Sequence, residues 1–225
     1  LMKSIWLCSY REWSDLICSQ IQTKFKTEDV IFSVCNTDSK FSYLISNYKY
    51  DLIFFIGWSN IVEESIVKSN TCICLHPSLL PKYRGGSPIQ HQIINGETVS
   101  GVTLFLMDSG IDTGPIVFQK QFGIEDCDLQ EVFEKIVSIG TEGCIKIIEK
   151  HIANLSLNPV EQDNSKSSYF KRRKKYMSEI KLEDFSNYTS KELFDKIRSL
   201  QNPYPNAFVK CKDNTILYLI KSTYK

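Results

Sequence analysis

An imidazole and a carboxylate occur in two separate loop segments of this chain. His76 opens the segment His-Pro-Ser-Leu-Leu-Pro-Lys-Tyr-Arg-Gly, and Asp112 follows 36 residues later within Asp-Ser-Gly-Ile-Asp-Thr-Gly. Imidazole titrates near neutral pH, and an adjacent carboxylate orients it and tunes its affinity for a proton. If the fold brings the two side chains together, we expect a site that moves protons, which suits acyl transfer to an amine.

Simpler roles exist for the same residues. His76 could be a satisfied loop histidine, and Asp112 could be a turn-forming residue before Thr-Gly. The alternation of Cys72, Cys74 and His76 also places three possible metal ligands on one side of an extended strand. Zinc usually takes four ligands, and no fourth candidate lies nearby in the sequence, so we expect no metal.

The apolar pattern predicts the elements that must position these residues. Runs rich in Ile, Val, Phe and Leu alternate with segments of helical spacing, which indicates a mostly parallel sheet with crossover helices. The expected strands are residues 3–9, 29–35, 51–57, 71–75, 101–107 and 116–122. The expected helices are residues 60–68, capped by Ser59 or Asn60, and 89–95, 129–154 and 190–200.

We therefore predict an α/β, Rossmann-like fold with flanking helices. Both loops follow strand ends at the edge of the sheet where open α/β sheets bind ligands. Residues 208–211 and 216–220 flank Lys-Asp-Asn and predict a small β-hairpin after the last helix. We divide the chain into a catalytic domain, residues 1–180, and a C-terminal helix and hairpin extension, residues 181–225.

Composition excludes several functions. The 225 residues have a net charge of +1, 42% hydrophobic and 24% charged residues, and no apolar run long enough to span a bilayer. We expect neither membrane insertion nor nucleic acid binding, and we interpret the basic run at residues 171–175 as a solvated surface or an anion contact. Eight scattered cysteines without a signal peptide indicate free thiols in the cytoplasm.

Several motifs, in the same order, resemble those of the folate-dependent formyltransferases. The likeness lies in residues 76–88, the turn Asn95-Gly96-Glu97 and residues 101–114. The resemblance implies 10-formyltetrahydrofolate as co-substrate and a catalytic set of His76, Asp112 and the residue at position 74. In this family His76 would stabilise the oxyanion and shuttle a proton, and Asp112 would orient His76 and accept a proton.

Position 74 departs from the family pattern. The family has Asn two residues before the histidine, and this chain has Cys74. A thiol is a weaker hydrogen-bond donor than an amide, and loss of one oxyanion donor typically costs about 100- to 1000-fold in turnover. A rescued natural variant, an introduced substitution and lost activity are the three explanations. Our hypothesis is the first, with water or backbone groups as donors.

The resemblance also implies binding residues. The pterin ring of the folate would lie beside two loops, and the acceptor would contact the loop after His76. The implied cofactor-binding residues are Trp58, Ser59, Asn60, Ile61, Asp108, Ser109 and Gly110. The implied substrate-binding residues are Ser78, Lys82, Tyr83, Arg84 and Gln90, and we expect Lys82, Tyr83 and Arg84 to project toward a phosphorylated ligand.

The acceptor is inferred from segments outside these motifs. Glycinamide ribonucleotide transformylases resemble chains with a glycine-rich phosphate loop after the first strand, where this chain has no glycine. Methionyl-tRNA formyltransferases have a C-terminal barrel domain, whereas this sequence stops after one hairpin. Residues 169–173 and 202–208 resemble sugar N-formyltransferases. We therefore favour a nucleotide-linked amino deoxysugar, dTDP-linked, formylated for a bacterial surface polysaccharide such as the O-antigen of lipopolysaccharide.

Other functions stay open at this point. A methionyl-tRNA formyltransferase-like enzyme, a formyltetrahydrofolate hydrolase and a catalytically impaired folate-binding homologue would share the same core. The identity of the sugar carbon and of the base is not determined by the sequence. The hairpin needs a packing surface because an isolated hairpin is marginally stable, and we expect a homodimer formed through it.

Overall fold

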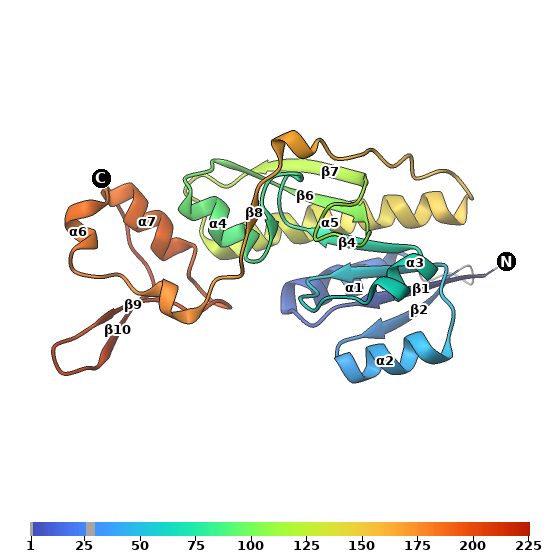
Figure 1. The fold of residues 1–225 in the computed structure, drawn as a ribbon, viewed down its shortest axis with the longest axis horizontal. Helices are drawn as coiled ribbons and strands as arrows, with labels where there is room; N and C mark the ends of the chain where they lie inside the picture. The colour runs from blue at the N-terminus through green and yellow to red at the C-terminus, as the bar shows by residue number, and fades with distance from the viewer. Residues whose placement is uncertain (1, 26–29) are drawn as a thin grey trace.

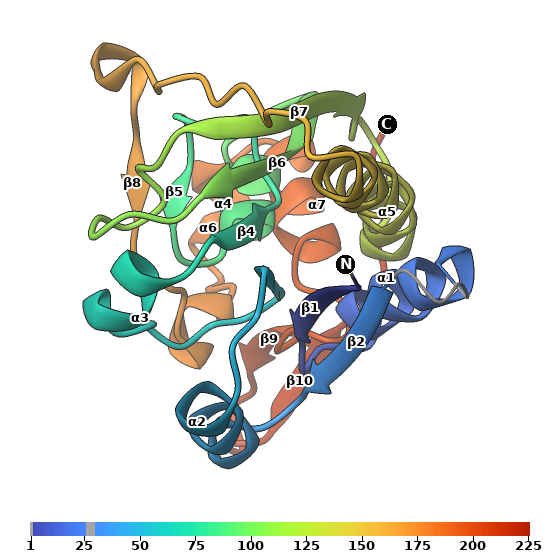
Figure 2. The ribbon, with the colours of Figure 1, turned by 90° about the vertical axis from the view of Figure 1, so that its right-hand side faces the viewer.

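The computed structural model describes residues 2–25 and 30–225 and contains a six-stranded sheet with helices on both faces (Figures 1 and 2). Its strand order is β2-β1-β3-β4-β6-β7. The strands are β1 (Lys3–Cys8), β2 (Val30–Cys35), β3 (Leu52–Ile56), β4 (Cys72–His76), β6 (Val99–Leu106) and β7 (Ile116–Gly123). The first four are mutually parallel, and β6 and β7 are antiparallel to their neighbours. The predicted mostly parallel α/β fold is confirmed.

Alternating side chains explain how the sheet is covered. Along β1, Ile5 and Leu7 join one apolar cluster, while Trp6 and Cys8 join a second cluster on the opposite face. The first cluster includes residues of α1 (Glu12–Lys24) and α5 (Leu129–Ile152), and the second includes residues of α2 (Asp38–Asn47) and α3 (Glu64–Ser69). Strands of a sheet that is buried on both faces need apolar side chains on both sides, and these strands accordingly contain no long polar stretches.

The helix expected at residues 60–68 is corrected by the structure. Helix α3 begins at Glu64, and neither Ser59 nor Asn60 caps it. The Asn60 amide instead donates to both carboxylate oxygens of Asp38, at 2.7 and 2.8 Å. These hydrogen bonds hold Asn60 in the loop that precedes α3. This loop stands at the mouth of the site described below.

The other expected elements are found with small shifts. Helix α5 begins with a capping box between Asp128 and Glu131, and the helix after the site is α4 (Pro88–Ile94). Two very short strands that the sequence did not predict pair with each other: β5 (Arg84–Gly85) and β8 (Tyr169–Phe170). The second expected strand starts with residue 29, which lies outside the described residues.

The C-terminal segment forms its own small cluster beside the sheet. It contains α6 (Asp184–Asn187), α7 (Ser190–Arg198), β9 (Ala207–Lys210) and β10 (Ile216–Leu219), and the last two strands form the predicted antiparallel hairpin. The remaining short elements are the 3-10 turns Asn164–Lys166 and Lys175–Ser178. In Figure 1 this segment lies at the end of the molecule opposite α2. The division of the chain at residue 180 stays a prediction.

Arg198 anchors this segment to the sheet domain. Its guanidinium forms a buried ion pair with Asp195 at 2.6 Å and donates to the carbonyl oxygens of Ile124 and Cys127. Every donor of a buried guanidinium needs such partners. Within the described residues, no helix is both long and apolar enough to cross a membrane.

Candidate active site

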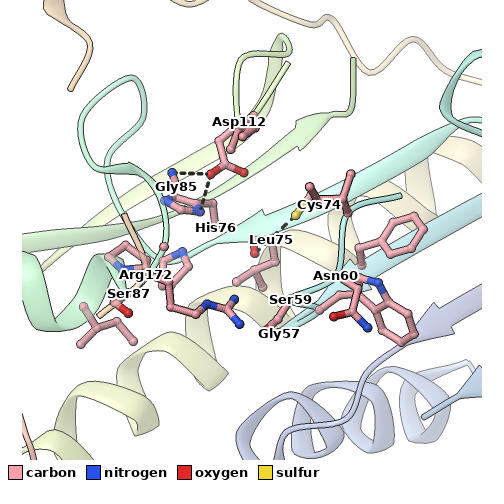
Figure 3. A pocket seen from close by; sticks show the side chains of 18 of the residues that line it. Gly57, Ser59, Asn60, Cys74, Leu75, His76, Gly85, Ser87, Asp112 and Arg172 are labelled. Carbon is pink, nitrogen blue, oxygen red and sulfur yellow. Dashed lines mark hydrogen bonds and ion pairs between the residues drawn. The ribbon is translucent and has the colours of Figure 1, made fainter. Parts of the chain in front are cut away.

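A cavity of about 800 Å³ opens beside the carboxyl ends of β3 and β4. The loops that line it are residues 57–64, 85–90, 107–112, 172–174 and 203–205, together with the end of β4. A volume of this size suits a ligand as large as a cofactor or a nucleotide. Both residues of the predicted proton-moving pair lie in this lining (Figure 3).

His76 and Asp112 face each other as the sequence predicted. The His76 Nδ1 atom lies 3.4 Å from Asp112 Oδ2, and both side chains are largely buried. The same carboxylate oxygen accepts the Gly85 N–H at 2.8 Å. Asp112 has a φ of 56°, in the left-handed region, and this backbone turn directs its carboxylate back toward β4.

The hydrogen bond of the other imidazole nitrogen, Nε2, determines which ring nitrogen of His76 bears the hydrogen. The His76 Nε2 atom lies 2.7 Å from the carbonyl oxygen of Tyr83, which can only accept, so Nε2 bears a hydrogen and donates it. The Nδ1 atom therefore faces the carboxylate, and their contact is attractive when a proton lies between them. The contact brings an imidazole nitrogen and a carboxylate oxygen close enough to share a proton.

Cys74 lines the cavity on the same strand. Burial, and secondly the charge of Asp112, raise the pKa of the Cys74 thiol well above its usual range. The thiol is therefore protonated at neutral pH and has one weak contact, at 3.8 Å, to the carbonyl oxygen of Leu75. Position 74 thus offers the cavity a poor hydrogen-bond donor where the resemblance implies an amide.

Comparison with known proteins identifies the family. The formyl transferase domain profile matches residues 18–148, more than half of the chain. The chain belongs to the formyl transferase family. Methionyl-tRNA formyltransferases from Nitratiruptor and Lachnospira eligens are 37% identical over 150 residues and 36% identical over 174 residues. These alignments cover 66% and 76% of this chain but 47% and 53% of the relatives, so the chain spans about half the length of the curated relatives it matches.

Solved structures share the fold at low sequence identity. A 4-N formyltransferase from Francisella tularensis superposes with a TM-score of 0.80 and 24% identity, over 100% of this chain and 99% of that chain. A sugar N-formyltransferase from Shewanella gives a TM-score of 0.78 with 20% identity, over 100% and 99% of the two chains. HypX from Aquifex aeolicus, solved with tetrahydrofolic acid, gives 0.76 with 17% identity, over 93% of this chain and 36% of that chain.

All seven residues assigned to the folate by the resemblance line the cavity. They are Trp58, Ser59, Asn60, Ile61, Asp108, Ser109 and Gly110. Trp58 also packs against Tyr10 and Phe55, with ring centroids 5.0 and 6.0 Å apart, so it supports the loop as well as lining the cavity. The Asp108 carboxylate holds its own loop by accepting from Thr113 Oγ1 at 2.6 Å and Gly110 N–H at 3.0 Å.

The residues assigned to the acceptor are mostly engaged elsewhere. Gln90 lines the cavity, whereas Ser78, Lys82, Tyr83 and Arg84 do not. The expected projection of Tyr83 and Arg84 is wrong, because both side chains are buried. The Tyr83 hydroxyl donates to Glu97 at 2.8 Å, and Arg84 donates to Gln162 and Asn164. The Ser78 hydroxyl donates to the Lys82 carbonyl oxygen, and only the Lys82 side chain is exposed.

The structure adds cationic residues that the sequence argument did not assign to the site. Arg11, Arg172, Arg173 and Lys174 line the cavity. The last three belong to the basic run interpreted as a solvated surface or an anion contact. The sequence feature that could have indicated them is the pair Gly85-Gly86. Only glycines allow residues 170–172 to cross so close to the backbone at these two positions, as described below.

Among the described residues, no three His, Cys, Asp or Glu side chains are grouped as metal ligands. All eight cysteines are free.

Proposed function

We propose that the chain transfers a formyl group from 10-formyltetrahydrofolate to the amine of a nucleotide-linked amino sugar. The observation that supports this most is the His76–Asp112 contact at the base of a cavity of cofactor size, in a chain of the formyl transferase family. Formyl transfer needs a group that takes a proton from the attacking amine and a group that stabilises negative charge on oxygen.

The cavity residues fit a folate. Ile61 and Ile111 line the cavity with 91% and 52% of their surfaces exposed, so they offer apolar surface that a bound ligand would cover. Gln90 is buried, and its Oε1 atom has no partner within the described chain. An unpaired buried acceptor costs free energy, which a donor on a ligand would offset.

The roles of the chain's own residues follow from the geometry. When bound, 10-formyltetrahydrofolate would supply an activated formyl group. Asp112, fixed by the Gly85 N–H, accepts the proton that the amine loses as its nitrogen bonds to the formyl carbon. His76, fixed by the Tyr83 carbonyl, takes this proton from Asp112 at Nδ1 and passes it to the departing folate nitrogen. The amine gains a C–N bond, and the folate nitrogen loses its C–N bond and gains a proton.

The amino sugar is favoured by the lining of the cavity. Among the described residues, four cationic and four acidic residues line the cavity, and the Arg172 guanidinium extends into it, as an acceptor with a compact diphosphate would require. Structural neighbours named as sugar N-formyltransferases match the full length of this chain, which adds to this preference. A second candidate, formylation of methionyl-tRNA, is favoured by the curated sequence relatives.

One assay separates these functions. The chain is incubated with 10-formyltetrahydrofolate and either a dTDP-amino deoxysugar, a UDP-amino sugar, charged methionyl-tRNA or no acceptor. Product mass and tetrahydrofolate release are then measured. Formamide on the sugar supports the proposal, formylated methionyl-tRNA favours the second candidate, and release without any acceptor indicates a hydrolase. No release in any arm would leave a folate-binding homologue and overturn the proposal.

A further inference from the structure

The backbone on both sides of Arg172 is held by the catalytic loop and helix α4. On one side, the Lys171 carbonyl oxygen lies 3.0 Å from His91 Nε2, which donates to it. On the other side, the Arg173 N–H donates to Ser87 Oγ at 3.0 Å. Arg172 is thus presented by an anchored segment rather than by a free loop.

The glycine pair explains how this segment comes so close. A Cβ atom on Gly86 would lie 2.5 Å from the backbone N and Cα of Arg172, and a Cβ atom on Gly85 would lie 2.3 Å from the Phe170 carbonyl oxygen. Side chains at these two positions would collide with backbone, so the crossing requires glycine. The Phe170 ring also stacks between Tyr83, at 5.0 Å, and His91, at 4.7 Å, and fixes the crossing further.

The Arg172 side chain extends into the cavity, toward the loop that contains Gly57 and Ser59 (Figure 3). Within residues 2–25 and 30–225, no carboxylate forms an ion pair with it and no hydrogen bond engages it. A guanidinium delivered into a ligand cavity by a fixed backbone, without a counter-ion in the described chain, is positioned for an anion of the ligand.

Two further guanidinium groups line the same cavity. Arg11 and Arg172 both lie close enough to the Tyr204 phenol to lower its pKa, although burial raises that pKa to about 12. Arg11 also donates to Ser59 Oγ at 3.2 Å. The Arg173 Nε–H is buried without a partner in the described residues, although its Nη2 atom donates to the Met177 carbonyl oxygen. Four carboxylates in the part of the chain that the structure describes, Glu63, Glu64, Asp108 and Asp112, also line the cavity, but none of them forms an ion pair with Arg172, and the Arg173 Nε–H is an unused donor.

We propose that Arg172, with Arg11, binds a phosphate group of the acceptor substrate. This inference rests on the proposed function, since it names the part of the acceptor that is recognised. A planar guanidinium binds phosphate through two parallel hydrogen bonds, and several of them match the charge of a diphosphate better than that of one carboxylate. The segment that delivers Arg172 packs on the loop after His76, so the bound anion would share the cavity with the His76–Asp112 pair.

The test uses binding, so that it does not depend on turnover. Affinities of inorganic pyrophosphate, dTDP and 5-formyltetrahydrofolate are measured by calorimetry for the wild type and for Arg172→Ala, Arg172→Lys and Lys171→Ala. Lys171 is the matched control, because its exposed side chain loses the same charge one residue away and does not line the cavity. Circular dichroism and melting temperature establish that each variant is folded.

We expect Arg172→Ala to weaken pyrophosphate and dTDP about 10- to 100-fold while 5-formyltetrahydrofolate binds within about twofold of the wild type. Arg172→Lys should retain part of the affinity, and Lys171→Ala should change none of the three. Unchanged pyrophosphate and dTDP affinity in Arg172→Ala would overturn the proposal. A larger loss for the folate would assign Arg172 to the folate carboxylates instead. Wild-type protein that binds 5-formyltetrahydrofolate but neither phosphate probe would refute the phosphate site alone, whereas failure to bind the folate would refute the proposed function.

Discussion

Replacing Asp112 with asparagine removes a proton acceptor while preserving the shape of the site. One carboxylate oxygen of Asp112 meets both the Gly85 N–H, at 2.8 Å, and His76 Nδ1, at 3.4 Å. The asparagine Oδ1 atom can still accept the Gly85 N–H, so the loop keeps its anchor. The amide cannot take up a proton, and no charge remains to orient a protonated imidazole.

The size of the effect follows from that geometry. A positioned general acid or base typically contributes about 100- to 10,000-fold to the rate. Because the Gly85 hydrogen bond is kept, the cost in folding stability should stay within about 1 kcal/mol. We therefore expect Asp112→Asn to lower kcat by about 100- to 10,000-fold with little change in folate affinity.

The assay is tetrahydrofolate release with the best acceptor, followed over a range of pH, with folate affinity and melting temperature measured on the same samples. Asp163→Asn is the control, since that carboxylate lies in an exposed turn outside the cavity. A kcat for Asp112→Asn within tenfold of the wild type would refute the assigned role of the pair. A large drop in folate affinity or melting temperature would show that the residue acts through structure instead.

Four further predictions concern packing, pH, assembly and position 74. Gly86→Ala should lower the free energy of unfolding by about 1–3 kcal/mol, measured with denaturant. Gly123→Ala is the control and should be nearly neutral, because the nearest atom to its Cβ would be 4.0 Å away. Equal effects of the two substitutions would contradict the close backbone crossing at Gly86. Burial lowers the pKa of His91 below its usual 6.5. The contribution of neutral His91 to folding stability is therefore complete above pH 6.5 and is lost as the pH falls through the lower pKa of the folded state. In thermal melts, the His91→Gln variant should lose less stability in acid than the wild type does, and identical acid profiles would contradict this. Leu217 is 57% exposed on the hairpin, so the wild type should sediment as a dimer and Leu217→Asp as a monomer; a monomeric wild type at micromolar concentration would disprove the dimer. If other donors replace the family asparagine, Cys74→Asn should change turnover by less than about tenfold, and a gain of several orders of magnitude would show that the wild-type site lacks a donor.

The sheet could be predicted because short-range patterns determine it, and the two loop motifs identified the residues of the catalytic pair. Alternating apolar runs identified the strands, and the regular spacing of apolar residues in α5 identified the longest helix. The expected shared edge is wrong, because β6 runs antiparallel to β4 and the loop after β6 begins at the end of β4 opposite His76. Asp112 reaches His76 because residues 107–112 fold back along β4.

The acceptor side of the cavity could not be predicted in the same way, because it depends on contacts between distant segments. Arginine is a residue type that often binds ligands, yet the Arg84 guanidinium donates its hydrogen bonds to Gln162 and Asn164 inside the protein. Arg172 belongs to a run that is typical of solvated surface, yet it enters the cavity where β8 crosses the loop at Gly86. Neither outcome is visible until residues about 80 positions apart in the chain are placed side by side.

The charge of Asp112 also bears on which atom attacks the formyl group. A thiol, an imidazole and a carboxylate, here Cys74 and His76 on β4 and Asp112 in the loop after β6, are the usual components of a site with a cysteine nucleophile, which needs a lowered thiol pKa. Here burial and Asp112 both raise the pKa of Cys74, so the thiolate is scarce at neutral pH. The same carboxylate that can accept a proton from an incoming amine therefore disfavours a covalent route through sulfur. Direct attack by the amine is the path that the electrostatics of this site favour.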